Sequence, residues 1–107
     1  MALSRLKEKL TKENLWIYIL GMLKKEPMYG YEIASRLRND LHINTAIITI
    51  YVVLYRMEKE KLIERQKTQE GGSGLKRVYY TVTDSGNITF EQGMGLIETT
   101  LRTLRAI

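Results

Sequence analysis

Residues 45–61 read TAIITIYVVLYRMEKEK, and the conformation of this stretch decides the fold. Its first half is rich in β-branched side chains and by local propensity could form a strand. Four apolar residues, however, recur at spacings of three, four and three, which is the period of one helical face: Ile47, Ile50, Leu54 and Met57. The stripe continues into strong helix formers without a break. We therefore predict one amphipathic helix over residues 45–61, capped at its N-terminus by Asn44 or Thr45.

Two strand signals follow this helix. The first covers residues 62–68, and the second, residues 77–83, contains VYYTV, the strongest strand signal in the chain. Between them lies EGGSG, residues 70–74, which is typical of a hairpin tip. Lysine and arginine flank this tip on both strands. The pattern predicts a cationic two-stranded hairpin with its wing at residues 69–77.

Upstream of residue 45, apolar spacing and the single proline divide the chain into three helical segments: residues 3–10, 14–25 and 29–39. Helices followed by a hairpin and a last helix predict a winged helix-turn-helix, a mostly α fold with a small β-hairpin (α+β). We expect a single domain, in which residues 1–83 form the winged unit with its N-terminal extension and residues 84–107 form a C-terminal dimerisation helix.

The C-terminal segment has the pattern of a coiled coil. Thr83 can cap this helix, and Asp84 is favourable in its first turn. Apolar residues then recur at spacings of four, three, four and three: Phe90, Met94, Ile97, Leu101 and Leu104. The N-terminal helix carries a shorter apolar stripe at Leu3, Leu6 and Leu10. Two glycines, Gly93 and Gly95, lie inside the C-terminal seam and predict a bend or a close approach there.

Composition narrows the classes of function that the chain could have. The 17 Lys and Arg exceed the 12 Asp and Glu by five, and the pI is about 9.5, so the chain favours polyanionic partners such as nucleic acid. The chain has no cysteine and no apolar run of membrane-spanning length, which fits a cytoplasmic protein. Its single histidine, His42, has no partner set for a metal. Because no nucleophile–base arrangement is visible, we expect no catalysis, cofactor or metal.

Three blocks of sequence together resemble the PadR-type transcriptional regulators: PMYGYEIASRL, TIYVVLYRMEKEKLIE and KRVYYTVTDSG. The resemblance spans about residues 15–90. It implies a dimeric repressor or activator, with repression favoured, that binds a pseudo-palindromic operator as a homodimer. It also implies dimerisation through the C-terminal helix, braced by the N-terminal one. Where the family commonly has glycine before the threonine and proline after the tyrosine, this chain has Ile48 and Val52.

The residues expected at DNA come from the predicted recognition helix, the wing and the helix before them. By resemblance, Thr49 and Tyr51 match the family's recognition-helix motif, and Lys76, Arg77 and Tyr79 match the strand after the wing tip. By position, the set also includes Thr45, Ile48, Val52, Arg56, Lys67 and Arg36.

Two alternatives remain open at this stage. The apolar face of Ile48, Val52 and Tyr55 could bind a protein instead of DNA, which would make the chain a winged-helix interaction module. Separately, Trp16 or Tyr18 could contact a small-molecule effector, although packing in the core is the default for such aromatic residues. Tyr51 is also ambiguous, because it lies beside the predicted core stripe.

Overall fold

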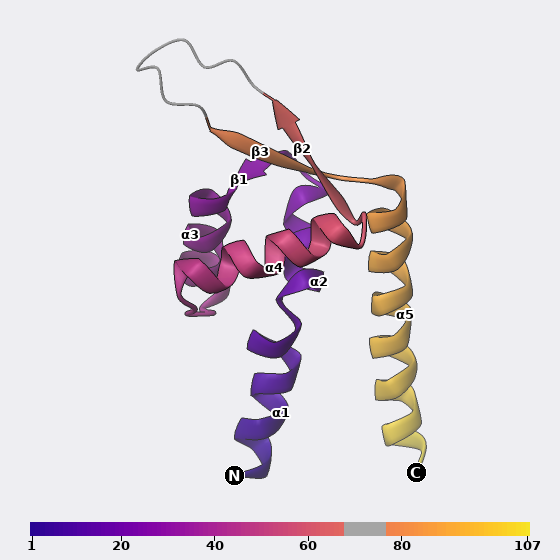
Figure 1. The fold of residues 1–107 in the computed structure, drawn as a ribbon. Coiled ribbons are helices and arrows are strands. Elements are labelled where there is room, and N and C mark those ends of the chain that lie inside the picture. Colours follow the sequence, from indigo (N-terminus) through magenta and orange to yellow (C-terminus); the bar gives the residue numbers. More distant parts are fainter. Residues whose placement is uncertain (68–76) are drawn as a thin grey trace.

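A computed structural model describes residues 1–67 and 77–107, without the side chain of Lys67. It confirms the predicted winged helix-turn-helix: mostly helical, with a small antiparallel sheet at one end of the helical core (Figure 1). The elements in chain order are α1 (Ala2–Leu10), a short 3-10 helix (Lys12–Asn14), α2 (Leu15–Leu23), β1 (Met28–Tyr29), α3 (Gly30–Leu41), α4 (Ile47–Lys59), β2 (Ile63–Lys67), β3 (Val78–Val82) and α5 (Asp84–Ala106).

The core lies between α2, α3, α4 and the inner face of the sheet. The most deeply buried side chains come from all four of these elements: Ile19, Leu20, Met28, Ile33, Leu37, Ile50, Leu54 and Ile63. Three members of the predicted stripe on α4, Ile50, Leu54 and Met57, are buried, and Ile47 is half-buried. The helical reading of this stretch is thus confirmed for residues 47–59, because the stripe faces the core throughout, whereas the predicted end at Lys61 is two residues too late.

The start of α4 differs from the prediction. We expected Asn44 or Thr45 to cap it, but the helix begins at Ile47 after an extended Ala46 with φ −64° and ψ 145°. The Ala46 carbonyl accepts from the N–H of Thr49 at 3.0 Å. Thr45 therefore lies in the segment that leads into the helix. Burial of Ile43 fixes the path of this segment, and such a tertiary contact overrides the local capping preference.

The sheet has three strands rather than the predicted two, in the order β1–β3–β2. β1 pairs antiparallel with β3, so that Met28 lies opposite Tyr80 and Tyr29 opposite Tyr79. β2 pairs with β3 from Ile63 opposite Val82 to Lys67 opposite Val78. The added strand ties the start of α3 to the hairpin, which orients the wing relative to the helices.

The end of α3 also differs from the sequence prediction, whereas the division between the first two helices agrees with it. α3 continues past Asn39 and Asp40 to Leu41, and it ends at His42, which adopts a left-handed conformation with φ 57°. Its N–H donates to the Leu37 carbonyl, so His42 closes the helix end. α1 and α2 are separate helices, divided near Thr11 by the 3-10 turn.

The junction between the hairpin and α5 is as predicted. Thr83 caps α5 by accepting a hydrogen bond from the N–H of Gly86 at 2.9 Å, and its hydroxyl donates to the Lys61 carbonyl at 2.7 Å. Gly86 is buried, and a Cβ there would collide with the Leu62 carbonyl oxygen. Absence of a side chain at this position lets α5 begin directly against the start of β2.

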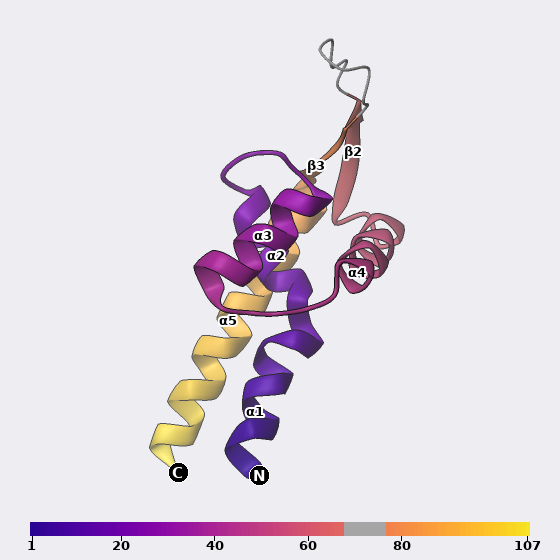
Figure 2. The ribbon, with the colours of Figure 1, turned by 90° about the vertical axis from the view of Figure 1, so that its left-hand side faces the viewer.

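α5 packs its first half on α2. A Cβ on Gly93 would lie 2.9 Å from Ile17 Cδ1 and 3.1 Å from Trp16 Cη2, so Gly93 marks the close approach expected from the sequence. Lys24 forms an ion pair with Glu91 at 3.0 Å across the same contact. Beyond it, α5 and α1 extend from the same end of the core, and both chain termini lie at that end (Figures 1 and 2).

Within the described part of the chain, no helix combines the length and apolar character needed to span a bilayer. Nor, in residues 1–67 and 77–107, do three or more His, Asp or Glu side chains gather where they could hold a metal ion.

Candidate nucleic-acid interface

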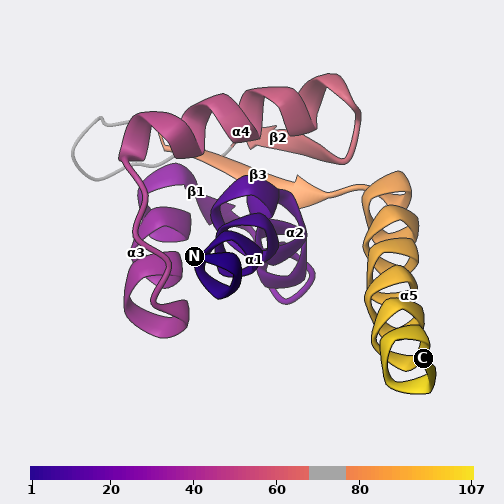
Figure 3. The same cartoon turned by 90° about the horizontal axis from the view of Figure 1, so that it is seen from below.

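The outer face of α4 is exposed along its whole length. Ile48 is 71% exposed and Val52 47% exposed, and Thr49, Arg56 and Lys59 are exposed beside them. Seen from below, α4 and the hairpin strands occupy one side of the molecule, and α5 runs away from it (Figure 3). The face opposite the buried stripe is therefore free to approach a large partner together with the hairpin.

Tyr51 lies at the edge of this face and is seated on α3. A Cβ on Gly30 would lie 2.5 Å from both Cζ and the hydroxyl oxygen of Tyr51, so the ring occupies the space that any other residue's side chain would need. Tyr31 packs edge-on against the ring, with centroids 6.3 Å apart. Partial burial, and then the proximity of Tyr31, raises the pKa of Tyr51, so its hydroxyl remains a hydrogen-bond donor at neutral pH. The ring is thus both packed and, at 40% exposed, accessible.

The base of the hairpin presents a second cluster on the outer face of the sheet. The Arg77 guanidinium carbon lies 4.9 Å from the centroid of the Tyr29 ring, a cation–π contact. Tyr29 and Tyr79, which are register partners on β1 and β3, meet edge to face at 5.5 Å. A cation at the root of the wing is therefore supported by two aromatic rings. Lys67 ends β2 but its side chain is not described, and Lys76 lies outside the described residues.

An ion pair braces the hairpin against α4. Arg65 Nε on β2 donates to Glu58 Oε2 at 2.9 Å, near the C-terminus of α4. This hydrogen bond, followed by the charge of Glu58, raises the pKa of Arg65. Tyr80 faces the same region, and burial, followed by the Glu58 charge, raises its pKa as well. The contact joins the C-terminal part of α4 to β2 of the hairpin.

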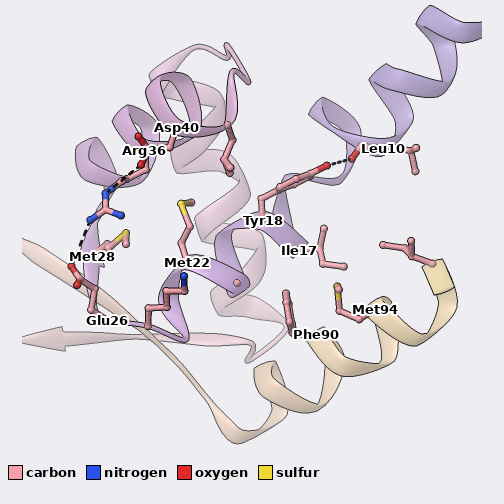
Figure 4. Close-up of a pocket in the computed structure, with 14 residues that line it drawn as sticks. Leu10, Ile17, Tyr18, Met22, Glu26, Met28, Arg36, Asp40, Phe90 and Met94 are labelled. Atoms are coloured by element: carbon pink, nitrogen blue, oxygen red, sulfur yellow. Dashed lines mark hydrogen bonds and ion pairs between the residues drawn. The ribbon is translucent and has the colours of Figure 1, made fainter.

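Arg36 is the predicted DNA-binding residue that the structure separates from the others. Its guanidinium lies 3.9 Å from Glu26 and 4.0 Å from Asp40, in a groove between α2, α3 and α5 (Figure 4). The groove has a volume of about 550 Å³ and does not include residues of α4. Arg36 therefore points away from the face formed by Ile48 and Val52.

The same groove contains part of the apolar set predicted for dimerisation. Leu10, Phe90, Met94 and Ile97 line it, and the Tyr18 hydroxyl reaches across to donate to the Leu10 carbonyl at 2.6 Å (Figure 4). The rest of the set lies outside the groove and is also exposed: Leu3, Leu6, Leu101 and Leu104. In one chain, the predicted dimerisation residues of α1 and α5 are thus exposed, except Phe90, which is half-buried against the core.

The sequence did not reveal the contacts that hold Tyr51 and Arg77 in place. Tyr29, Gly30 and Tyr31 all lie in the PMYGYEIASRL block, but nothing in their spacing indicates contacts with Tyr51, about 20 residues later, or with Arg77. The density of aromatic residues on both sides of one glycine was the available signal, because a glycine at a helix start often marks a close approach.

Comparison with known proteins agrees with this geometry. The profile of the transcriptional regulator PadR-like family matches residues 19–92. A solved PadR-like transcriptional regulator from Bacillus cereus is 35% identical, with a TM-score of 0.71, over 90% of this chain and 95% of that one. Bacillus subtilis PadR, solved in complex with operator DNA, is 30% identical with a TM-score of 0.68, and the match covers 75% of this chain.

These matches differ in how much of the relative they cover. The match spans 47% of the Bacillus subtilis PadR chain, and this chain covers 63% of an uncharacterised Lysinibacillus sphaericus protein to which it is 36% identical over 72 residues. The family profile nevertheless reaches from α2 through the hairpin into α5, and so includes the exposed face of α4 and the root of the wing. The chain belongs to the PadR-like family of transcriptional regulators, a family of regulators rather than of enzymes.

Proposed function

We propose that the chain is a homodimeric regulator that binds a pseudo-palindromic operator and represses transcription by occupying it. The observation that carries this proposal is the joint presentation, on one side of the molecule, of an exposed helix face and a cation-bearing hairpin. The complex of Bacillus subtilis PadR with operator DNA supports double-stranded DNA as the partner. Such a protein acts in the cytoplasm, where the operator is.

In this proposal α4 enters the major groove. An α-helix fits that groove, and side chains in its N-terminal half reach base edges. Ile48, Thr49 and Val52 face outward there, and Thr45 lies just before the helix. Arg56, later on the same face, is placed for phosphate contact. The Tyr51 hydroxyl, fixed by its seat on Gly30, donates to a phosphate at the edge of the groove.

The hairpin follows the adjacent backbone or minor groove. Arg77, Lys67 and Lys76 neutralise phosphates, and Tyr79 supports Arg77 through Tyr29. The Arg65–Glu58 pair fixes the angle between the hairpin and α4, so both can engage one duplex without rearrangement.

The homodimer forms through α5, braced by α1. Two exposed apolar stripes, one on α1 (Leu3, Leu6 and Leu10) and one on α5 (Met94, Ile97, Leu101 and Leu104), are too apolar to remain in water over such a length, and a second copy covers them. Residues 1–83 then act as the DNA-binding unit and 84–107 as the dimerisation helix. To reach two half-sites one turn of duplex apart, the α4 helices of the dimer must lie about 34 Å apart. An effector that reaches Tyr18 would enter the groove between α2 and α5, whereas Trp16 packs against Gly93.

Binding to duplex DNA at increasing salt tests the proposal. If six to ten phosphates are neutralised, the logarithm of the affinity falls against the logarithm of salt concentration with a slope of about −5 to −9. Arg77→Ala should weaken binding to all sequences and make this slope shallower, whereas Thr49→Ala should alter sequence preference at constant slope. A salt-independent affinity, or identical behaviour of the two variants, contradicts these roles.

A second candidate function rests on the apolar character of α4. Ile48 and Val52 are exposed and uncharged, and Tyr55 is 55% exposed next to them, as in a protein-docking helix. A winged-helix interaction module would give no electrophoretic shift of random duplex at low salt and micromolar protein. A shift under those conditions favours the DNA-binding function.

A further inference from the structure

The first nine residues of α4, IITIYVVLY (residues 47–55), contain no side chain that can make a bidentate hydrogen bond to a base. Guanine is read most often by Arg or Lys, and adenine by Asn or Gln. None of these types occurs in the helix before Arg56. If α4 enters the major groove from its N-terminal half, base discrimination must come from another kind of contact.

The exposed positions of this half present methyl groups instead. Ile48 and Val52 are one turn apart on the outer face of the helix, and Thr49, also exposed, adds a third branched side chain next to them. The three lie opposite the buried stripe of Ile50 and Leu54, so they are the α4 side chains that would contact a partner first.

Only one of the four bases offers this surface an apolar partner in the major groove, because thymine alone carries a C5-methyl group. We propose that Ile48 and Val52 read thymine C5-methyl groups, so that each operator half-site is specified by A·T pairs with thymine at the contacted positions. This inference rests on the proposed function, whose recognition surface it describes in chemical terms.

The residues around the exposed methyl groups of Ile48, Thr49 and Val52 favour DNA rather than a protein as the binding partner. Arg56 and Lys59 follow on the same exposed face, Tyr51 is 40% exposed on the same helix, and Arg77 precedes β3 at the root of the hairpin. An apolar strip a single helix wide, flanked by donors and cations, matches the methyl-lined floor and phosphate walls of a thymine-rich major groove.

The test replaces thymine by deoxyuridine, which lacks the C5-methyl group and keeps every Watson–Crick hydrogen bond. The best-bound duplex is first selected from a random pool with the full-length protein. Each thymine of a half-site is then replaced singly, and affinity is measured. At the one or two contacted positions, loss of a buried methyl group should weaken binding about fourfold, and at the others it should have no effect.

Variants of the protein link each effect to a side chain. In Ile48→Ala or Val52→Ala, one deoxyuridine position should lose its effect, because the methyl partner is already absent. Both residues are exposed, so neither change should disturb the fold. Ile88→Ala is the matched control, an aliphatic residue in the first turns of α5 whose exposure lies between those of Ile48 and Val52, and it should keep the wild-type response to deoxyuridine.

The outcomes separate the two proposals. If a duplex is selected but all deoxyuridine substitutions are neutral, or if Ile48→Ala and Val52→Ala respond to them as the wild type does, methyl readout is wrong and the DNA-binding function stands. If no duplex is enriched at all, the DNA-binding function itself fails, and methyl readout fails with it.

Discussion

Replacing Gly30 with alanine tests how the recognition surface is built. A Cβ at this position would lie 2.5 Å from Cζ and 2.6 Å from Cε1 of Tyr51, against an ordinary carbon–carbon contact of about 3.5–4.0 Å. The ring would have to move by about 1 Å or more. Alanine in a helix is favoured over glycine by up to ~1 kcal/mol. The substitution therefore combines a destabilising clash with Tyr51 and a stabilising gain in helix propensity.

The magnitudes predict opposite signs in two backgrounds. With Tyr51 present, overpacking costs about 1–3 kcal/mol, which outweighs the helix gain, so Gly30→Ala should destabilise the fold by about 1 kcal/mol. In a Tyr51→Ala background the clash is absent, and the same change should stabilise by about 0.5–1 kcal/mol. The coupling free energy is then about 2 kcal/mol, well above the error of a double-mutant cycle.

Urea unfolding of the four proteins, followed by circular dichroism, measures this coupling. Gly95→Ala is the control, because a Cβ there meets nothing within 4 Å, and its effect should be the same with and without Tyr51. DNA affinity should fall about tenfold in Gly30→Ala as the Tyr51 hydroxyl leaves its position, a loss typical of one hydrogen bond to a charged group. If Gly30→Ala changed the free energy of unfolding equally in both backgrounds, the proposed packing of the Tyr51 ring against Gly30 would be refuted.

Three further predictions concern the frame around this surface. Gly86→Ala sets a methyl group against the Leu62 carbonyl, a backbone atom that cannot move independently, and should cost more than about 3 kcal/mol in thermal unfolding; a cost below 1 kcal/mol contradicts the packing. If the proposed homodimer forms through α5, Leu101→Asp should convert it to monomer in analytical ultracentrifugation and leave the helical content unchanged, whereas a dimer that persists excludes α5 as the interface. Burial raises the pKa of the Tyr80 hydroxyl in the folded protein. The resulting contribution to the free energy of unfolding is complete below the pKa of the unfolded chain, near 10, and is lost as the pH rises through the pKa of the folded protein. Tyr80→Phe should remove that alkaline loss in urea unfolding, and an unchanged pH profile refutes it.

Most of the fold could be predicted from the sequence, because a long periodic pattern of apolar residues identifies a long helix. The stripe from Ile47 to Met57 outweighed β propensity, and Thr83 marked the start of α5. β1 was missed because two residues carry no period, and its pairing partner lies about 50 residues later on β3. The start of α4 was misplaced because the burial of Ile43, rather than a capping side chain, positions the preceding segment.

The candidate site was only partly accessible from sequence. Positions on α4 could be assigned to a face from the buried stripe of that helix alone, so Ile48, Thr49 and Val52 were predicted as exposed, and they are. Arg36 could not be assigned in this way. Helical periodicity says that it is on the outside of α3, but only the packing of α2 and α5 decides that it faces a groove rather than the α4 surface.

Photocrosslinking tests the central claim, that α4 lies in the major groove of the operator, most directly. A duplex with 5-iodouracil in place of single thymines carries the iodine where the methyl group projects into that groove, next to Tyr51 and Tyr55 if α4 is inserted. After irradiation and trypsin digestion, the crosslinked DNA should be attached to the peptide of residues 39–56, which ends at Arg56. Attachment only to other peptides, with residues 39–56 recovered unmodified, would contradict the account.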